Sequence, residues 1–193
     1  MIEYRPIEDA DIPTIVRLYA ENLNDGQAYA DLIQRSWEAG EYFGLCAVED
    51  GVLQGFMSMR PGIAFTYPHP EIEAELAELV GEEPVANCDA LIVLPVSRHN
   101  GLAHKLAKKV REILLEQGYR YYLAEIWIYP DGTAPAKNTF ESVGKVVFER
   151  RCDMFYRDLA QYGMSCPVCG PDCICGAWVE VMDMKEPAPA QAQ

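Results

Sequence analysis

A predicted strand, turn and helix between Ala90 and Leu114 constrain the fold of this 193-residue chain more than any other segment. The apolar run at residues 90–94 is typical of a buried strand, and Pro95 ends it. A short polar turn follows. Beyond the turn, apolar residues recur at helical spacing, at Leu102, Leu106, Val110, Ile113 and Leu114.

The turn between this strand and helix has the chemistry of an anion-binding site. It reads Arg98-x-x-Gly101-x-Ala103, and its small residues allow a ligand to approach the backbone closely. The first turn of the helix leaves several N–H groups without partners, at the positive end of the helix dipole. In a chain of net charge −14, a local basic cluster favours an anionic ligand such as a pyrophosphate. Besides Arg98, this cluster contains Lys105, Lys108, Lys109 and Arg111.

The same segment resembles the acyl-CoA-binding motif of the GNAT family of N-acetyltransferases. In that family a strand ending Val-x-Pro precedes Arg or Gln, two residues, Gly, one residue, and Gly or Ala. Val93-Leu94-Pro95 and Arg98–Ala103 have this spacing. The alternative is an ordinary strand-to-helix turn before a charged helix. The resemblance implies that acetyl-CoA is the co-substrate and contacts Leu91, Ile92, Val93, Leu94, Arg98, His99, Asn100, Gly101, Leu102, Ala103, His104 and Lys105.

The order of the predicted elements also matches this family along nearly the whole chain. Strands are expected at residues 2–5, 42–49, 52–59, 90–94, 121–129, 145–158 and 178–184. Helices are expected at residues 9–22, 28–39, 71–80, 102–117 and 135–143, with a loop at 60–70. The resemblance implies the GNAT fold, an α/β (α+β) architecture. Its central mixed, largely antiparallel sheet has about seven strands, a splayed central pair and helices on both faces.

Composition bounds the class of protein. The length and a hydrophobic content of 50% predict a single domain at residues 1–185. A tail at 186–193, rich in Pro and Ala, is expected to be disordered. Sixteen basic residues against 30 acidic ones argue against nucleic acid or an anionic membrane as a partner. The sequence contains no signal-peptide pattern and no apolar run of about 18 residues, so a cytoplasmic protein is expected.

Four of the seven cysteines lie close together, at Cys166, Cys169, Cys173 and Cys175. In a reducing compartment such a cluster favours a metal site over a disulfide framework, and four thiolates are typical of structural zinc. The segment from Cys166 to Gly170 also resembles a zinc knuckle, although the Cys-x-Cys half is less typical. The cluster falls in a predicted loop, 159–177, between the last two strands, which in the resembling family lies beside the acceptor site. Redox-active thiols and a site shared between chains are the alternatives.

Amine acetylation needs a base that takes a proton from the ammonium group and a way for the thiolate to leave. Asp89 and Glu125 are the candidate bases, since each is a carboxylate on an otherwise apolar central strand. Glu125 is favoured because its neighbours are more apolar. The alternative for each is a solvent-facing position or a pair with a structural arginine. Where many GNAT proteins carry a catalytic Tyr this chain has Phe140, so the thiolate leaves unassisted or another Tyr, such as Tyr122 or Tyr129, donates the proton.

These observations predict an acetyl-CoA-dependent N-acetyltransferase that acts on a primary amine by direct attack on the thioester. The acceptor is expected to be a small molecule or peptide, and cationic because the protein is acidic. Two alternatives remain open: a catalytically silent acyl-CoA-binding regulator, and a scaffold whose zinc loop docks a partner protein. A homodimer is also left open. The identity of the acceptor is not encoded in any motif.

Overall fold

The computed structural model describes residues 1–24, 26–63, 65 and 69–188. Its centre is a seven-stranded sheet in the order β1-β2-β3-β4-β5-β7-β6, in which only the β4–β5 pair is parallel. The strands are β1 (Glu3–Pro6), β2 (Phe43–Glu49), β3 (Val52–Pro61), β4 (Val85–Val93), β5 (Tyr121–Ile128), β6 (Lys145–Cys152) and β7 (Gly176–Asp183). This mixed, largely antiparallel sheet confirms the predicted fold class.

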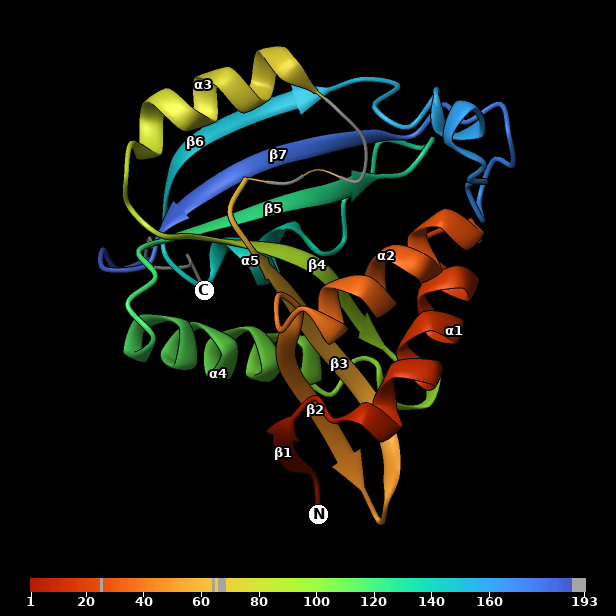
Figure 1. Cartoon of the computed structure of the whole chain (residues 1–193), viewed down its shortest axis with the longest axis vertical. Coiled ribbons are helices and arrows are strands. Elements are labelled where there is room, and N and C mark those ends of the chain that lie inside the picture. Colours follow the sequence, from red (N-terminus) through yellow and green to blue (C-terminus); the bar gives the residue numbers. More distant parts are fainter. Residues whose placement is uncertain (25, 64, 66–68, 189–193) are drawn as a thin grey trace.

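Helices cover both faces of the sheet, as Figure 1 shows. They are α1 (Ile12–Asn22), α2 (Gln27–Glu38), α3 (Pro70–Val80), α4 (Leu102–Glu116) and α5 (Lys137–Glu141). One hydrophobic core contains residues of α1, α2, α3 and the loop between β6 and β7, and the other contains residues of α4 and α5. The segment between the first strand and helix differs slightly from the prediction, because residues Asp9–Asp11 form a 3-10 turn before α1. Within the described residues, no helix is both long and apolar enough to cross a membrane.

The two central strands separate halfway along their length. Parallel pairing of β4 with β5 runs from Val85↔Tyr121 to Cys88↔Ala124 and then ends, whereas β5 continues to pair with β7 to its last residue. Figure 1 shows β4 and β5 diverging from this point. The predicted splayed pair is therefore present, and it leaves one edge of β4 without β5 from Asp89 onward.

A β-bulge lies at the point of separation. The register of β3 on β4 passes from Ser58↔Ala90 to Met59↔Cys88, so Asp89 is the extra residue. The bulge interrupts the regular alternation of side chains between the two cores. Cys88 precedes the bulge and Leu91 follows it, and both pack in the core with α4, although residues three apart on a regular strand face opposite sides. Asp89 and Ala90, although adjacent, therefore both face the core beneath α1 and α2.

Several boundaries differ from the sequence predictions. The strand predicted at 90–94 begins five residues earlier, at Val85. The predicted strand 145–158 ends at Cys152, because the chain then turns through Met154 at a φ of 53°. The predicted loop 60–70 is shorter, since β3 includes Pro61 and α3 begins at Pro70; residues 64 and 66–68 lie outside the described part of the chain. The predicted tail begins with a turn, in which Glu186 donates to the Asp183 carbonyl; residues 189–193 are not described.

Candidate active site

The turn for which the sequence predicts anion binding lies between β4 and α4, and α4 follows it directly. The backbone passes through positive φ at His99 (65°) and Gly101 (71°), and α4 begins at the next residue. Among the described residues, the first backbone N–H after that of Arg98 to reach a carbonyl oxygen is that of Lys105, which donates to Gly101 at 3.1 Å. The N–H groups between them are therefore available to an anion at the start of a 15-residue helix.

The basic residues of this segment do not all serve the turn. Arg98 folds back over the end of β4, where its Nε donates to the Val93 carbonyl at 2.9 Å. Further along α4, Lys109 lies over the ring of Tyr4, and Arg111 donates to the backbone of Met184. Arg98 and Lys105 are the cations that remain beside the turn, so the main-chain N–H groups dominate its anion-binding character.

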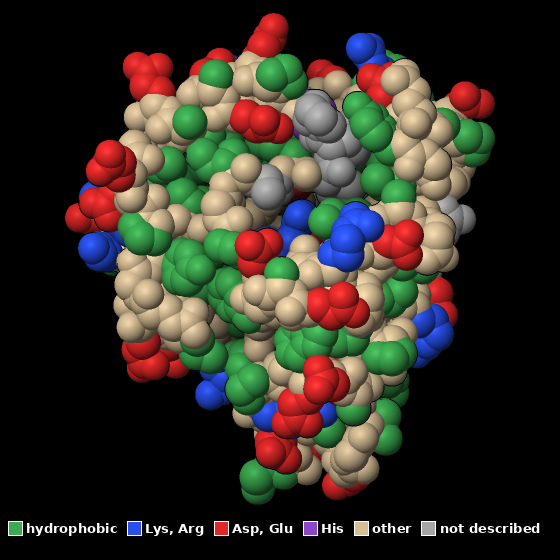
Figure 2. All heavy atoms as spheres, in the orientation of Figure 1, with side chains coloured by type: hydrophobic (Ala, Val, Ile, Leu, Met, Phe, Trp, Pro, Cys, Tyr) green, Lys and Arg blue, Asp and Glu red, His purple; other side chains and the backbone are tan. Residues whose placement is uncertain are grey.

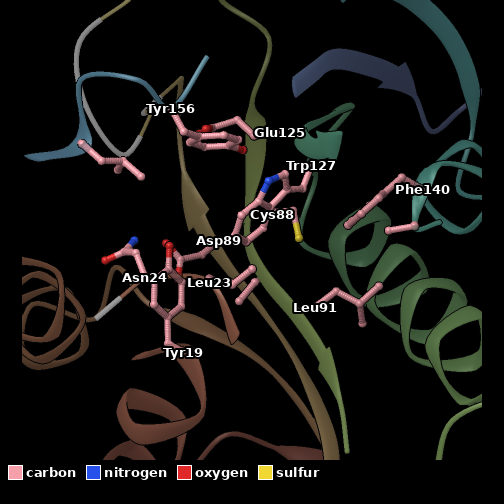
Figure 3. A pocket seen from close by; sticks show the side chains of 13 residues that line it. Tyr19, Leu23, Asn24, Cys88, Asp89, Leu91, Glu125, Trp127, Phe140 and Tyr156 are labelled. Carbon is pink, nitrogen blue, oxygen red and sulfur yellow. The ribbon is translucent and has the colours of Figure 1, made fainter. Parts of the chain in front are cut away.

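A pocket opens where β4 and β5 separate. Its cavity measures about 120 Å³ and is lined from both sides of the sheet. Figure 3 shows Tyr19, Asn24 and Asp89 gathered on one side of the pocket and Leu91 and Phe140 on the other. Since Tyr19 belongs to the core under α1 and α2, and Phe140 to the core under α4 and α5, the pocket connects the two faces of the molecule. Two substrates can therefore meet in it from opposite faces.

Asp89 is held in this pocket by partners distant in sequence. Its Oδ1 accepts hydrogen bonds from the Tyr29 hydroxyl and, at 2.8 Å, from the Arg60 Nε. Its Oδ2 is buried and has no hydrogen-bond partner in the described part of the chain. Burial, together with the charge of Asp89, raises the pKa of Tyr29 well above its usual range, so this tyrosine remains a donor. The arginine pair that the sequence left as the alternative for Asp89 is present, and Asp89 also lines the pocket.

Glu125 lines the same pocket from β5. It shares a strand face with Trp127, and Tyr156 of the β6–β7 loop completes this wall; the Trp127 and Tyr156 ring centroids are 5.5 Å apart. The structure thus brings both candidate carboxylates to one cavity, together with aromatic side chains that the sequence analysis did not single out. Trp127 lies one residue before the end of β5, and Tyr156 lies beyond the end of β6. Such positions are too common in a sequence to identify residues that line a pocket.

The opposite side of the pocket contains Phe140, whose side chain is buried and carries no proton donor. Tyr122 packs beside it, with ring centroids 6.2 Å apart, and its buried hydroxyl interacts with the thiol of Cys88. Tyr129, by contrast, lies on the surface and stacks on Trp127. Of the two tyrosines named as substitutes for the missing donor, Tyr122 lies on the side of Phe140.

Lys137 fixes the short helix α5 against the sheet. Its ammonium contacts Glu149 at 2.6 Å, Glu141 at 3.0 Å and the buried Glu180, and it lies 4.5 Å from the centroid of the Trp178 ring. Burial raises the pKa of Glu180 to about 7, against the opposing effect of Lys137. Glu180 of β7 is therefore a buried carboxylate paired with a lysine. Because the carboxylates hold the pKa of Lys137 above its usual range, this lysine is unsuited to protonating a thiolate.

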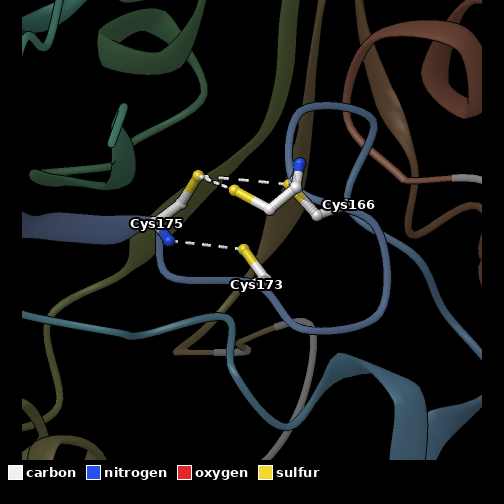
Figure 4. Close-up of side chains that lie close together, drawn as sticks. Cys166, Cys173 and Cys175 are labelled. Atoms are coloured by element: carbon white, nitrogen blue, oxygen red, sulfur yellow. Dashed lines mark hydrogen bonds between the residues drawn. The ribbon is translucent and has the colours of Figure 1, made fainter. Parts of the chain in front are cut away.

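The four clustered cysteines converge as predicted. All four sulfurs lie within 4.8 Å of one another; Cys175 Sγ is 4.0 Å from Cys166 Sγ and 3.5 Å from Cys169 Sγ (Figure 4). Backbone N–H groups of Val168 and Cys169 point at Cys166 Sγ, each at 3.4 Å. Zn–S bonds of about 2.3 Å in a tetrahedron place sulfurs roughly 3.8 Å apart, which these separations bracket. The donor set and its backbone N–H bonds therefore fit a zinc ion.

Comparisons with known proteins agree with this geometry. Residues 12–144 match the family model described as Acetyltransferase (GNAT) family. The structure of Arabidopsis thaliana NAA60 in complex with acetyl-CoA is similar, with a TM-score of 0.68 and 17% identity over 96% of this chain and 99% of that one. So is that of yncA, a putative acetyltransferase from Salmonella typhimurium with its cofactor acetyl-CoA, with a TM-score of 0.63 and 17% identity over 100% and 99% of the two chains. No curated protein matches the sequence.

Proposed function

Because the chain belongs to the GNAT acetyltransferase family, we propose that it transfers the acetyl group of acetyl-CoA to a primary amine by direct attack on the thioester. The observation that carries this proposal is the pocket between β4 and β5, which connects the anion-binding side of the sheet with a carboxylate-lined side. Acetyl-CoA would bind with its pyrophosphate on the turn from Arg98 to Lys105. Its thioester would then lie along the edge of β4 that β5 leaves unpaired.

The acceptor amine would enter from the side of α1. There the unpartnered Asp89 Oδ2 offers a buried acceptor for an ammonium N–H, and Glu125 lines the same cavity. A buried carboxylate oxygen without a partner is costly, so an ammonium group that supplies one gains binding energy. Figure 2 shows acidic side chains spread over the face of the molecule that carries α1 and α2, which favours the approach of a cation. The acceptor is therefore proposed to be a cationic primary amine.

Glu125 is proposed as the base. The Asp89 Oδ1 already accepts hydrogen bonds from Tyr29 and Arg60, which fixes the carboxylate in place, so Asp89 orients the ammonium group and Glu125 accepts its proton. The neutral amine then attacks the carbonyl carbon, and main-chain N–H groups of β4 stabilise the oxyanion. The C–S bond breaks and CoA leaves as a thiolate, which takes a proton from water, because burial raises the pKa of Tyr122 well above its usual range and makes it a poor donor.

The same proposal includes one structural zinc ion, held by Cys166, Cys169, Cys173 and Cys175. Burial raises the pKa of the Cys173 thiol well above its usual range and that of the Cys175 thiol to about 12, which favours the neutral form of these two side chains when no cation is bound. A metal ion would deprotonate the thiols and turn them into strong hydrogen-bond acceptors. Because four thiolates leave no open coordination position, the zinc would stabilise the loop and take no part in the chemistry.

An assay of free-thiol release from acetyl-CoA over a panel of primary amines tests the transferase activity. The panel should include polyamines, lysine-containing peptides and peptides with a free α-amino group. Amine-dependent thiol release is the expected result. Tight acetyl-CoA binding by calorimetry with no turnover on any amine would instead favour the catalytically silent regulator, for which the absence of a donor at Phe140 is the supporting observation.

A further inference from the structure

The loop between β6 and β7 forms part of the wall of the acceptor pocket. Tyr156 and Leu159 line the cavity, and Phe155, Leu159 and Met164 pack into the core beneath α1 and α2. Beyond them the chain reaches the cysteine cluster, three of whose members, Cys166, Cys173 and Cys175, are buried in that same core. The position of the pocket wall therefore depends on how this loop is held.

Cys175 joins the cluster to the wall in two ways. Its carbonyl accepts the backbone N–H of Tyr156 at 3.4 Å. Trp127 pairs across the β5–β7 ladder with Ala177, two residues beyond Cys175, and its side chain packs against the core that contains the Cys175 side chain. Trp127 and Tyr156 both line the pocket, with Asp89 and Glu125. Two residues of the acceptor wall thus pack near one cysteine of the cluster.

The indole N–H of Trp127 is a buried donor, and its Nε1 makes no hydrogen bond of standard geometry within the described residues. A neutral thiol is a weak acceptor, and a buried donor left in this state costs free energy. A zinc-bound thiolate at the same place would be a charged acceptor, for which this N–H is a suitable partner.

We propose that zinc bound at the four cysteines sets the shape of the acceptor pocket, because the Cys175 thiolate anchors Trp127 through its indole N–H and Tyr156 through its backbone. This inference rests on the proposed acetyltransferase function and assigns the metal a role in acceptor recognition. Trp127 is a positioning residue in this arrangement: it joins the metal centre to the wall of the pocket that faces Glu125. The CoA-binding turn lies across the sheet, on α4, and is independent of the metal.

The first experiment uses Co²⁺ as the probe and requires no enzymatic activity. The protein purified under reducing conditions is stripped of metal and reconstituted with one equivalent of Co²⁺, and its thiolate-to-metal charge-transfer band is recorded. Trp127→Phe should shift this band and weaken metal affinity about tenfold, since a bond to one ligand is lost. Trp37→Phe, which changes a tryptophan on α2 that donates to Asp9, should leave both unchanged. Failure to bind Co²⁺, or identical bands for Trp127→Phe and the unchanged protein, would overturn the inference.

The second experiment follows the pocket itself. After zinc removal, amide hydrogen exchange should increase at residues 153–159, the Michaelis constant for the best amine of the panel should rise about tenfold, and the acetyl-CoA affinity measured by calorimetry should stay the same. Adding Zn²⁺ should restore both changed quantities. Cys169→Ser should reproduce the effects of metal loss, and Cys152→Ser, at a half-buried cysteine outside the cluster, should not.

The outcomes separate this inference from the proposed function. Zinc removal that leaves hydrogen exchange at 153–159 unchanged would overturn the role of the metal even in an active acetyltransferase. Conversely, a protein with no turnover on any amine but with the expected Co²⁺ band shift and exchange increase would retain the metal-anchored wall and lose the proposed activity.

Discussion

Arg60 and Asp89 form a buried ion pair across the β3–β4 ladder, in which the Arg60 Nε lies 2.8 Å from the Asp89 Oδ1 and the two side chains are 10% and 1% exposed. Asp89 is also the bulge residue of β4, at the point where β4 and β5 separate. The arginine therefore holds the carboxylate at the opening of the pocket while the Oδ2 remains unpartnered. This relationship supports the proposal that Asp89 orients the acceptor and that Glu125 removes its proton.

Replacing either partner of this pair should strongly destabilise the protein. Asp89→Asn leaves the buried Arg60 without its counter-charge, which for buried pairs costs about 3–5 kcal/mol of unfolding free energy. Denaturant unfolding of Asp89→Asn, Arg60→Met and the double variant measures the effect. The double variant should lose less than the sum of the two single losses. Additive losses would show that the two side chains do not interact energetically.

Glu125→Gln tests the assignment of the base. The variant keeps the size and polarity of the side chain but cannot accept the proton, so kcat/KM for the best amine should fall about a hundredfold or more. The limb of the pH–rate profile that reports the base should also disappear. Glu116→Gln, at an exposed carboxylate near the end of α4, is the matched control and should retain full activity. A profile for Glu125→Gln that coincides with that of the unchanged enzyme would transfer the role to Asp89 or to water.

Two glycines that flank α4 provide a matched test of the proposed CoA-binding turn. Gly101 precedes the helix at a φ of 71° and Gly118 follows it at 87°, and an added Cβ would meet open space at both. Gly101→Asp and Gly118→Asp therefore introduce the same charge and a similar backbone strain. Only Gly101→Asp places a carboxylate beside the pyrophosphate, so it alone should weaken acetyl-CoA binding measured by calorimetry. Equal affinities for the two variants would exclude this turn as the phosphate site.

Departure of the thiolate should depend little on position 140. A thiol with a pKa near 8.5 is a tolerable leaving group, so Phe140→Tyr should leave kcat unchanged or raise it modestly. Because burial raises the pKa of Tyr122 and makes it a poor proton donor, Tyr122→Phe should also leave kcat nearly unchanged. The measurement is the rate of thiol release at saturating acetyl-CoA. A large gain in Phe140→Tyr alone would show that the missing donor limits the natural enzyme.

Local features of the active site were predictable because backbone stereochemistry fixes them. Asp-Gly is a residue pair that two-residue hairpin loops favour, and the hairpin at Asp50-Gly51 has positive φ at both residues. In the turn before α4, His99 and Gly101 have positive φ. Short-range spacing also brought the four cysteines together, because their ligand atoms are separated by few residues and need only one tight loop. In each case the pattern and its geometry lie within a dozen residues.

The sequence by itself determined the strand, turn and helix that would bind CoA, and the two carboxylates on central strands. Only the tertiary structure decided the partners of each carboxylate, since Arg60 and Tyr29 reach Asp89 from 29 and 60 residues away. The bulge at Asp89, the burial of Glu180 and the backbone hydrogen bond from Tyr156 to Cys175 were likewise decided by the pairing of whole strands and the packing of a distant loop. Such contacts depend on which strands become neighbours and in which register, and the free energy that selects them belongs to the whole sheet and its two cores.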